Sequence, residues 1–312
     1  MTLMKLRLRF LVKNLKAFTT MSAPDPESDP EEAITQEEIA GTAPAPASST
    51  SGVAVTHGAK RNAFQELMAS KPKKPVPQTL ASTRADYTGA LTLRDGLSAY
   101  TQNPLSHPTG RVIYHNSNFV AINDLYPKSS VHTLLLPISP LSRYHPFEAF
   151  TDPSFLSLVQ AETLNLKSLV AKELQRRYGH YSAQDRLRES VLNEEIPWPS
   201  TKALPEGRNW VKDLLVGIHA HPSMNDLHVH VLSPDMYSEC LKHKKHYLSF
   251  NTPFLIDVKD FPLADDDPRL HPGKAGYLDA ELVCWRCRQS WGKSFKKFKA
   301  HLAEEFEAWK KE

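Results

Sequence analysis

The stretch 219–235, HAHPSMNDLHVHVLSPD, decides how this chain folds and where its chemistry lies. Apolar residues occupy every second position in its latter half, which is the pattern of a β-strand with one buried face. His228 and His230 are two positions apart and therefore project from the same face, with Asp226 just ahead of them. Two imidazoles on one face of a strand indicate a functional site, since core packing would favour apolar side chains there.

The histidines ahead of this strand extend the pattern. His219 and His221 lie seven to nine residues upstream of His228, and residues 222–225 read as a turn that folds His219 back toward His228. The residues leave two interpretations open, a zinc site made only of histidines and a polar catalytic pocket. Imidazole suits attack on phosphorus, because it is substantially neutral near pH 7 and its phosphoramidate breaks down readily.

The surrounding sequence predicts an α+β fold, with an antiparallel sheet and one long helix packed on one face. Residues 111–139 contain three runs rich in Val, Ile and Leu, separated by turn-forming residues, which predict three short strands. Residues 152–179 read as an amphipathic helix with an Asp-Pro start and a Gly stop. A shorter helix is predicted within 92–104, and residues 180–206 read as a polar insertion.

Composition limits the class of protein. Among 312 residues there are 24 Pro against 12 Gly, and the concentration of proline near the N-terminus favours a disordered arm there. No apolar run approaches the roughly 18–20 residues that span a bilayer, so no membrane partner is expected. The net charge of +3 is too small to indicate a partner. Three cysteines, two of them spaced as CxxC, favour a reducing compartment and a metal site over disulfides.

Residues 1–86 are predicted to be that disordered arm, with targeting and docking segments. Residues 1–20 carry five basic and no acidic residues, which fits either a mitochondrial transit peptide or an upstream extension with Met21 as the start. Residues 61–68, RNAFQELM, precede a basic tract and fit either a docking helix beside a nuclear-import signal or a solvated linker.

The C-terminal residues 276–312 are predicted to form a small zinc-binding module. Cys284 and Cys287 lie in a CxxC turn, and a following helix would place His301 and Glu305 on one face, four residues apart. Two thiolates from a turn and two groups from a helix make a closed tetrahedral site for structural zinc. The adjacent glutamate is a less well-placed fourth ligand, and a buried CxxC without metal is the alternative for the cysteine pair.

With these motifs in view, the chain resembles the histidine-triad (HIT) superfamily, whose motif is His-φ-His-φ-His-φ-φ with φ apolar. Residues 226–232 fit that motif except at its first position, where Asp226 stands in place of histidine. Within the superfamily, PSM before the motif, CLKHKKHYLSFNTPFLI at 240–256 and DLYPKSSVHTLLLP at 124–137 resemble the aprataxin branch. The resemblance covers roughly residues 90–312, and the glutamate in the zinc site resembles fungal aprataxin-like proteins.

This resemblance implies a HIT-type antiparallel sheet with packed helices over 87–275, and a role for each matching residue. His228, at the central position of the motif, is the expected nucleophile. His230 would bind the phosphate oxygens or position the nucleophile, and His219 would assist at the leaving group. The residues expected at the nucleotide and its phosphates are Ser223, Lys128, His132, Asp124, Ile122 and Leu125. For the two apolar ones, core packing is the alternative.

Basic residues surround the predicted finger and follow the histidine strand. A solvated charge run is the usual explanation of such clusters, but beside a phosphate-attacking histidine and a zinc finger they predict contacts to the DNA backbone, independent of base sequence. The residues assigned to this surface are Lys242, Lys244, Lys245, His246, Lys293, Lys296 and Lys297, and Arg286, Arg288 and Lys299 decorate the same module.

The implied activity is removal of AMP from the 5′-adenylated DNA ends that abortive ligation leaves, through a covalent histidyl-AMP intermediate. We expect structural Zn2+, no cofactor for the chemistry, and a monomer that binds double-stranded DNA with a 5′-adenylated nick or end. The expected location is the nucleus, with the mitochondrion as a second site if the N-terminal segment is a transit peptide. The alternatives are a general HIT hydrolase of small adenylated metabolites and a non-catalytic binder of DNA ends.

Overall fold

The structure is a computed structural model that describes residues 93–312. The predicted N-terminal arm over 1–86, with its targeting and docking segments, lies outside the described residues. Within 93–312 no helix is both long enough and apolar enough to cross a bilayer.

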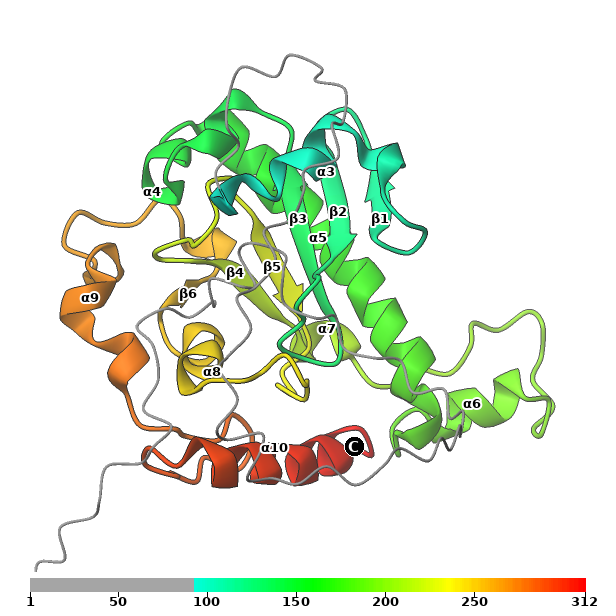
Figure 1. The fold of residues 1–312 in the computed structure, drawn as a ribbon. Helices are drawn as coiled ribbons and strands as arrows, with labels where there is room; N and C mark the ends of the chain where they lie inside the picture. Colours follow the sequence, from blue (N-terminus) through cyan, green and yellow to red (C-terminus); the bar gives the residue numbers. More distant parts are fainter. Residues whose placement is uncertain (1–92) are drawn as a thin grey trace, which may run out of the picture. The chain divides into compact units, whose positions relative to one another are not determined.

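A six-stranded sheet forms the centre of the fold, with the strands in the order β1-β2-β3-β5-β4-β6 and every neighbouring pair antiparallel (Figure 1). The strands are β1 (Val112–His115), β2 (Phe119–Asn123), β3 (His132–Pro137), β4 (Leu215–His219), β5 (Val229–Leu232) and β6 (Leu255–Ile256). The first three confirm the strands predicted within 111–139. The antiparallel sheet with packed helices confirms the predicted α+β fold class.

One face of the sheet is covered by α5 (Pro153–Tyr178), as Figure 1 shows. Asp152 caps the helix by accepting a hydrogen bond from the Phe155 amide at 2.8 Å, and Pro153 occupies the first turn, where its missing N–H costs nothing. Fully buried α5 residues such as Leu166 pack in one cluster with Val229 of β5. The predicted helix over 152–179 is therefore confirmed to within a residue.

The opposite face carries the histidines and is shared by two helices. Over β2 and β3 lies α3 (Ser98–Gln102), with Leu97 and Ile122 in a small apolar cluster beneath it. Over the other half of the sheet lies α8 (Lys244–Asn251). The helix predicted within 92–104 is confirmed as α3, but it is shorter than that range because Gly96 separates it from the preceding turn. The segment forms η1 (Leu93–Asp95), α3 and η2 (Pro104–Ser106).

The strand that carries the histidines is shorter than the alternation over 226–235 indicates. Only 229–232 pairs with β3 and β4, because the flanking amides bond to loops. The Leu227 amide donates to the Ser142 carbonyl at 2.7 Å, and the Ser233 amide donates to the Val131 carbonyl at 2.9 Å. His228 therefore lies just ahead of β5, at the end of a pleated strand rather than within it.

The predicted insertion over 180–206 contains one helix and is joined to the end of the chain. The amide of Ala183 donates to the Lys311 carbonyl at 2.9 Å, and the buried Asp185 accepts from the Trp210 indole at 2.8 Å.

The remaining elements are η3 (Pro140–Arg143), α4 (Pro146–Ala149), η4 (Gly179–Tyr181), α6 (Arg186–Leu192), α7 (Trp210–Asp213), η5 (Val258–Asp260), η6 (Pro268–Leu270), α9 (Pro272–Ala275), η7 (Tyr277–Asp279) and α10 (Phe295–Trp309).

The C-terminal module packs into the same core as the sheet domain. The predicted finger helix is α10, drawn in red in Figure 1, which follows Ser294. On its inner face Phe298 meets Tyr247 of α8 edge-to-face at 4.6 Å, and Trp309 meets Trp210 of α7 at 5.7 Å. Anything that unfolds the module therefore exposes side chains that also stabilise the sheet domain.

Candidate active site and metal centre

Three histidines come together where β4 and β5 pair. His219 ends β4 and His230 lies in β5, with Gly217 directly opposite His230 in the ladder. The imidazole of His230 lies 4.5 Å from that of His219 and 4.8 Å from that of His228, measured between ring centroids. The structure thus brings together the three residues that we expected to be catalytic.

A single hydrogen bond fixes the tautomer of His228. Its Nδ1 lies 2.8 Å from the carbonyl oxygen of Asp226, and a carbonyl can only accept. Burial lowers the pKa of His228, so the ring is neutral near pH 7 and carries its one hydrogen on Nδ1. Nε2 therefore keeps a free lone pair, and no residue of 93–312 donates to it. This nitrogen is a nucleophile in its reactive form.

The tautomer of His230 is set by a second chain of hydrogen bonds, which starts at His132 of β3. The Lys128 amide donates to Nδ1 of His132 at 3.1 Å, so Nε2 of that neutral ring carries the hydrogen. This Nε2 lies 3.0 Å from Nδ1 of His230 and donates to it. His230 must therefore carry its own hydrogen on Nε2, as a donor. Both ring nitrogens of His132 thus have partners within the chain, and its contact with the nucleotide stays a prediction.

Three buried polar atoms on the β4–β5 hairpin have no hydrogen-bond partner in the described part of the chain: Nε2 of His219, Oγ of Ser223 and Nε2 of His230. A buried polar atom left unpaired costs about 1–3 kcal/mol, so such atoms are rare in folded proteins. Ser223 and His230 are residues that we expected at the phosphates, and His219 is the one that we expected at the leaving group. Their free hydrogen-bonding capacity fits a ligand that supplies several oxygen atoms.

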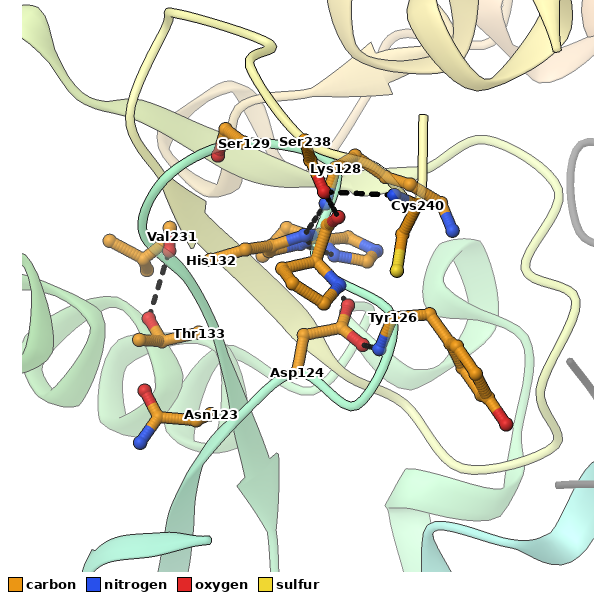
Figure 2. Close-up of polar contacts among 12 residues, drawn as sticks. Asn123, Asp124, Tyr126, Lys128, Ser129, His132, Thr133, Val231, Ser238 and Cys240 are labelled. Atoms are coloured by element: carbon orange, nitrogen blue, oxygen red, sulfur yellow. Dashed lines mark hydrogen bonds and ion pairs between the residues drawn. The ribbon is translucent and has the colours of Figure 1, made fainter. Parts of the chain in front are cut away.

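The loop between β2 and β3 carries the remaining predicted polar residues (Figure 2). Oδ1 of Asp124 accepts from the Tyr126 amide at 2.9 Å, and Oδ2 lies 3.4 Å from Nδ1 of His132. Burial raises the pKa of Asp124, but the neighbouring His132 and Lys128 outweigh that effect and hold it below its usual value. Asp124, His132 and His230 could also suggest a metal site, but the 3.0 Å hydrogen bond between the rings accounts for their approach.

Ile122 and Leu125, both expected at the adenine, have different surroundings. Ile122 is only 2% exposed and packs in the apolar cluster under α3, which fits the alternative of core packing. Leu125 is 38% exposed on the loop after β2, so its nucleotide contact stays a prediction. Lys128 is buried near the cluster, where its charge contributes to the lowered pKa values of His132 and His219.

The buried imidazoles make stability depend on pH. Burial lowers the pKa of His132 to about 4, and burial with neighbouring charges takes those of His219 and His230 well below the ordinary 6.5. Below pH 6.5 the unfolded chain then binds more protons than the folded chain, so stability falls as the pH drops toward 4, with His132 contributing roughly 3 kcal/mol. Urea unfolding of His132→Gln from pH 7.5 to 5 should show a shallower fall than wild type. An equally steep fall in both proteins would contradict the assignment.

The predicted zinc ligands come together at the C-terminal module. The ligand atoms of Cys284, Cys287, His301 and Glu305 all lie within 4.8 Å of one another. Sγ of Cys287 lies 3.2 Å from Nε2 of His301, and that nitrogen lies 3.3 Å from Oε1 of Glu305. A tetrahedral zinc site with ordinary bond lengths needs about 3.6 Å for the first separation and about 3.3 Å for the second. The donor set and its spacing are compatible with structural zinc.

The structure distinguishes between the two glutamates that could complete this site. Glu305 turns one oxygen toward the same nitrogen of His301 that faces Cys287. Glu304 is exposed and lies 3.9 Å from the other ring nitrogen of His301, which faces away. Glu305 is therefore the better-placed fourth ligand, as expected. Arg286 donates to the second oxygen of Glu305 at 2.7 Å, so its guanidinium is bound within the module.

The basic residues divide into an exposed group and a buried group. Lys293, Lys296 and Lys297 are exposed at the start of α10, and Lys244 starts α8 nearby; partial burial and the charge of Lys293 lower the pKa of Lys244. The predicted DNA contact of His246 is wrong, because this residue lies on the inner face of α8 and is fully buried. Its Nδ1 instead accepts from the Lys242 amide at 3.2 Å. The other lysines of the set, Lys242 and Lys245, remain exposed or half-buried.

Sequence reasoning missed the residues that hold Asp226. Its carboxylate is bound by Ser98 and Arg143, and its backbone carbonyl is the group that contacts His228. Ser98 lies 128 positions away in the sequence. Local sequence pattern does not predict a contact over that separation. The one indication in the sequence was that Asp226, a charged residue at the first motif position, would need a partner if buried.

Comparison with known proteins adds family relationships. Residues 107–236 match the HIT domain, and residues 251–308 match the C2HE / C2H2 / C2HC zinc-binding finger. The chain is 32% identical over 255 residues to "Aprataxin-like protein" of Schizosaccharomyces pombe, which covers 80% of this chain and 94% of that one. It is 33% identical over 219 residues to "Aprataxin-like protein" of Saccharomyces cerevisiae, with 68% and 95% covered.

Two solved structures are also similar to this chain. "Crystal structure of aprataxin ortholog Hnt3 in complex with DNA" shares 30% identity with a TM-score of 0.55, and the alignment covers 70% of this chain and 96% of that chain. "Hnt3 in complex with DNA and guanosine" shares 30% identity with a TM-score of 0.53, covering 70% and 97%.

Proposed function

Because this chain, with its HIT domain and C2HE finger, belongs to the aprataxin-like family, we propose that it is a hydrolase that removes AMP from 5′-adenylated DNA ends. The observation that carries the proposal is the bare Nε2 of His228. Its hydrogen is held on the opposite nitrogen by the Asp226 carbonyl, and unpartnered buried donors lie on the same hairpin. A nucleophile beside free donors is what transfer at phosphorus requires.

In the first step Nε2 of His228 attacks the phosphorus of AMP, and the bond from that phosphorus to the 5′-phosphate of the DNA breaks. The DNA phosphate leaves with the electron pair. The ring becomes positively charged, and its Nδ1–H, which faces the Asp226 carbonyl at 2.8 Å, stabilises that charge. The Nε2–H of His230 and the hydroxyl of Ser223 can bind the non-bridging oxygens as charge builds on them.

In the second step water attacks the phosphorus of the histidyl-AMP, the P–Nε2 bond breaks, and AMP leaves with release of one proton. His228 regains its neutral form because its Nδ1–H never left the ring. Two displacements replace one difficult one, which is the gain from covalent catalysis. Every step uses an imidazole, a hydroxyl or a backbone group of this chain, so the proposal needs no cofactor for the chemistry.

Binding to duplex DNA is the second part of the proposal, with the chain acting as a monomer in the nucleus. Related structures are described in complex with DNA, which supports it. Partial burial and the charge of Lys293 lower the pKa of the half-buried Lys244, so the start of α8 lies near the segment that leads into α10, and the lysines of both segments are the proposed basic surface. Phosphate contacts of this kind tolerate any flanking bases, as an enzyme that processes damaged ends must. A mitochondrial form would depend on residues 1–20, which lie outside the described residues.

Removal of a positive charge from the basic surface should weaken DNA binding by the same factor for every base sequence. Lys293→Ala and Lys296→Ala are each expected to reduce the slope of log K against log salt by about 1, for adenylated and plain nicked duplexes alike. The matched control is Lys172→Ala, an exposed lysine on α5, on the other face of the sheet. Fluorescence anisotropy across 50–200 mM salt measures the slope. An unchanged slope in both lysine variants would place the DNA elsewhere.

Mass spectrometry of the protein quenched during turnover of 5′-adenylated nicked DNA tests the reaction directly. An AMP adduct on the peptide that contains His228, with AMP and 5′-phosphorylated DNA as products, is the expected result. Equal turnover of small adenylated metabolites and DNA would favour a general HIT hydrolase. Tight binding of the DNA without any adduct or product would favour a non-catalytic binder of DNA ends.

A further inference from the structure

The carboxylate of Asp226 points away from the imidazoles and toward α3. The hydroxyl of Ser98 donates to Oδ2 of Asp226 at 2.7 Å, and Arg143 donates to Oδ1 at 3.1 Å. Arg143 also contacts the hydroxyl of Ser98 at 3.1 Å. Asp226 is only 5% exposed, so these charged hydrogen bonds act in a region where they are stronger than in water. The residue that replaces the first histidine of the motif is thus part of an ionic network.

Arg143 connects this network to a second buried carboxylate. Its Nη2 lies 2.6 Å from Oδ1 of Asp95, which is 7% exposed. The side-chain amide of Asn225 donates to the same oxygen at 2.9 Å. One guanidinium therefore neutralises two buried carboxylates. Arg143 itself is 47% exposed, and its loss would leave both buried carboxylates without that cation.

The backbone on both sides of Asp226 is held by the same segment. Arg94 donates from Nε to the Ser223 carbonyl at 2.6 Å and from Nη2 to the Pro222 carbonyl at 2.9 Å. The Asn225 amide returns a bond to the Arg94 carbonyl at 3.0 Å. Residues 94–98 thus bind the loop 222–226 at several points, and that loop leads directly into His228.

We propose that Asp226 is a positioning residue for the nucleophile. Its side chain, anchored by Arg143 and Ser98, fixes the peptide group whose carbonyl holds Nδ1–H of His228. Without that anchor the carbonyl can rotate, and the imidazole is then free to place its hydrogen on Nε2, where it blocks attack. The motif can therefore do without histidine at position 226, because its carboxylate orients the nucleophile through the backbone.

The same network couples α3 to the nucleophile. Ser98 is the first residue of α3, and an open hollow of about 530 Å³ beside it is lined by Ser98, Thr101, Gln102, Arg143 and Asp226, among others. This inference rests on the proposed function, because the orientation of Nε2 affects a reaction rate only if His228 is the nucleophile for AMP release.

The test compares Asp226→Asn and Arg143→Ala with wild type in two measurements. The first is 15N NMR of the imidazole of His228 in the free protein, assigned by its loss in His228→Ala. Wild type should show the Nδ1–H tautomer alone, and both variants a mixture. The second is steady-state kinetics on adenylated nicked DNA, where kcat should fall about 10- to 100-fold and KM should change little. Arg143→Lys should recover part of both signals.

Arg176→Ala is the matched control, because it removes an exposed arginine–carboxylate pair on α5 and should alter neither measurement. If Arg143→Ala does not fold, Asp226→Asn still decides, since it keeps the volume and the bond to Ser98. Variants that retain the pure Nδ1–H tautomer, or that lose activity only through KM, would overturn the inference. A wild-type protein that releases no AMP would overturn the proposed function. The NMR comparison would still show whether Asp226 and Arg143 control the tautomer of His228.

A different observation concerns the metal centre. Arg286 donates to Oε2 of Glu305 at 2.7 Å, while Oε1 of Glu305 faces His301. Zinc with two thiolates, one neutral imidazole and one carboxylate carries a net charge of −1, unlike the neutral site with two histidines. We infer that Arg286 balances this charge and orients Glu305 as a ligand. Arg286 is held in place by Glu312, which accepts from its Nε at 2.8 Å.

Competition with a chelating dye on the purified zinc-loaded protein tests this role. Arg286→Ala should weaken zinc binding about 10- to 100-fold, and Arg286→Lys, which keeps the charge and loses the planar fork, should lie between. Lys297→Ala removes an exposed charge from the same module and serves as the control. Zinc affinity equal to wild type in both Arg286 variants would show that the arginine has no role at the metal.

Discussion

Replacement of His228 by alanine is expected to abolish AMP release from adenylated nicked DNA, with kcat falling by at least about 10⁴-fold. Among the three histidines proposed to be catalytic, His228 is the one whose Nδ1–H donates to a carbonyl, which leaves the lone pair on its Nε2. His230 cannot take over, because its Nδ1 accepts from His132 and its Nε2 carries the hydrogen. Single-turnover measurements with excess enzyme isolate the chemical step from product release.

DNA binding by His228→Ala should be unchanged within about two-fold, since the basic surface lies on α8 and α10. His115→Ala is the matched control, because His115 is exposed at the end of β1 and takes no part in the cluster. It should retain wild-type turnover. Turnover by His228→Ala at the wild-type rate, or an AMP adduct on another histidine, would remove the basis of the mechanism.

Much of the fold follows from local sequence pattern. The Asp-Pro start and Gly stop place α5 within a residue, because capping and proline preferences act over one helical turn. The alternation around His228 and His230 places both on one face, because strand geometry leaves no other choice. The zinc ligands could also be found, since a CxxC turn and a helical spacing of four are properties of neighbouring residues.

The rest depends on contacts between distant segments, which local pattern does not contain. The ring of His132 binds His230 from a strand that lies 98 residues away in the sequence, and this contact selects the tautomer. His246 follows three basic or polar neighbours and reads as exposed, but the packing of α8 on the core turns it inward. Asp226 illustrates the same limit, because its partners are on α3 and η3.

Replacement of Cys287 by alanine is expected to cost one zinc per chain and to lower the melting temperature by at least about 10 °C. Structural zinc in isolated finger peptides contributes an apparent 10–16 kcal/mol or so to folding, and a site with three ligands retains only part of this. Cys287 is exposed, so the loss of its side-chain packing alone would be small. Metal analysis of the purified variant and calorimetry measure the two effects.

The destabilisation should reach beyond the module, because α10 shares its core with the sheet domain. Phe298 and Leu302 pack with Tyr247, and Trp309 packs with Trp210 next to α5. If the metal orders α10, its loss frees these side chains and loosens α8, which covers the histidine face. We therefore expect Cys287→Ala to lose deadenylation as well as DNA affinity, whereas a finger tethered outside the core would lose affinity alone.

Cys240→Ala separates the effect of metal from that of packing. Cys240 is buried and lies outside the ligand cluster, so its replacement removes a packed side chain without touching a ligand. It should keep one zinc per chain and destabilise by about 1–2 kcal/mol, as expected for a small cavity in the core. A Cys240→Ala variant as unstable as Cys287→Ala, or a wild-type protein purified without metal, would show that packing rather than zinc holds α10 against the core.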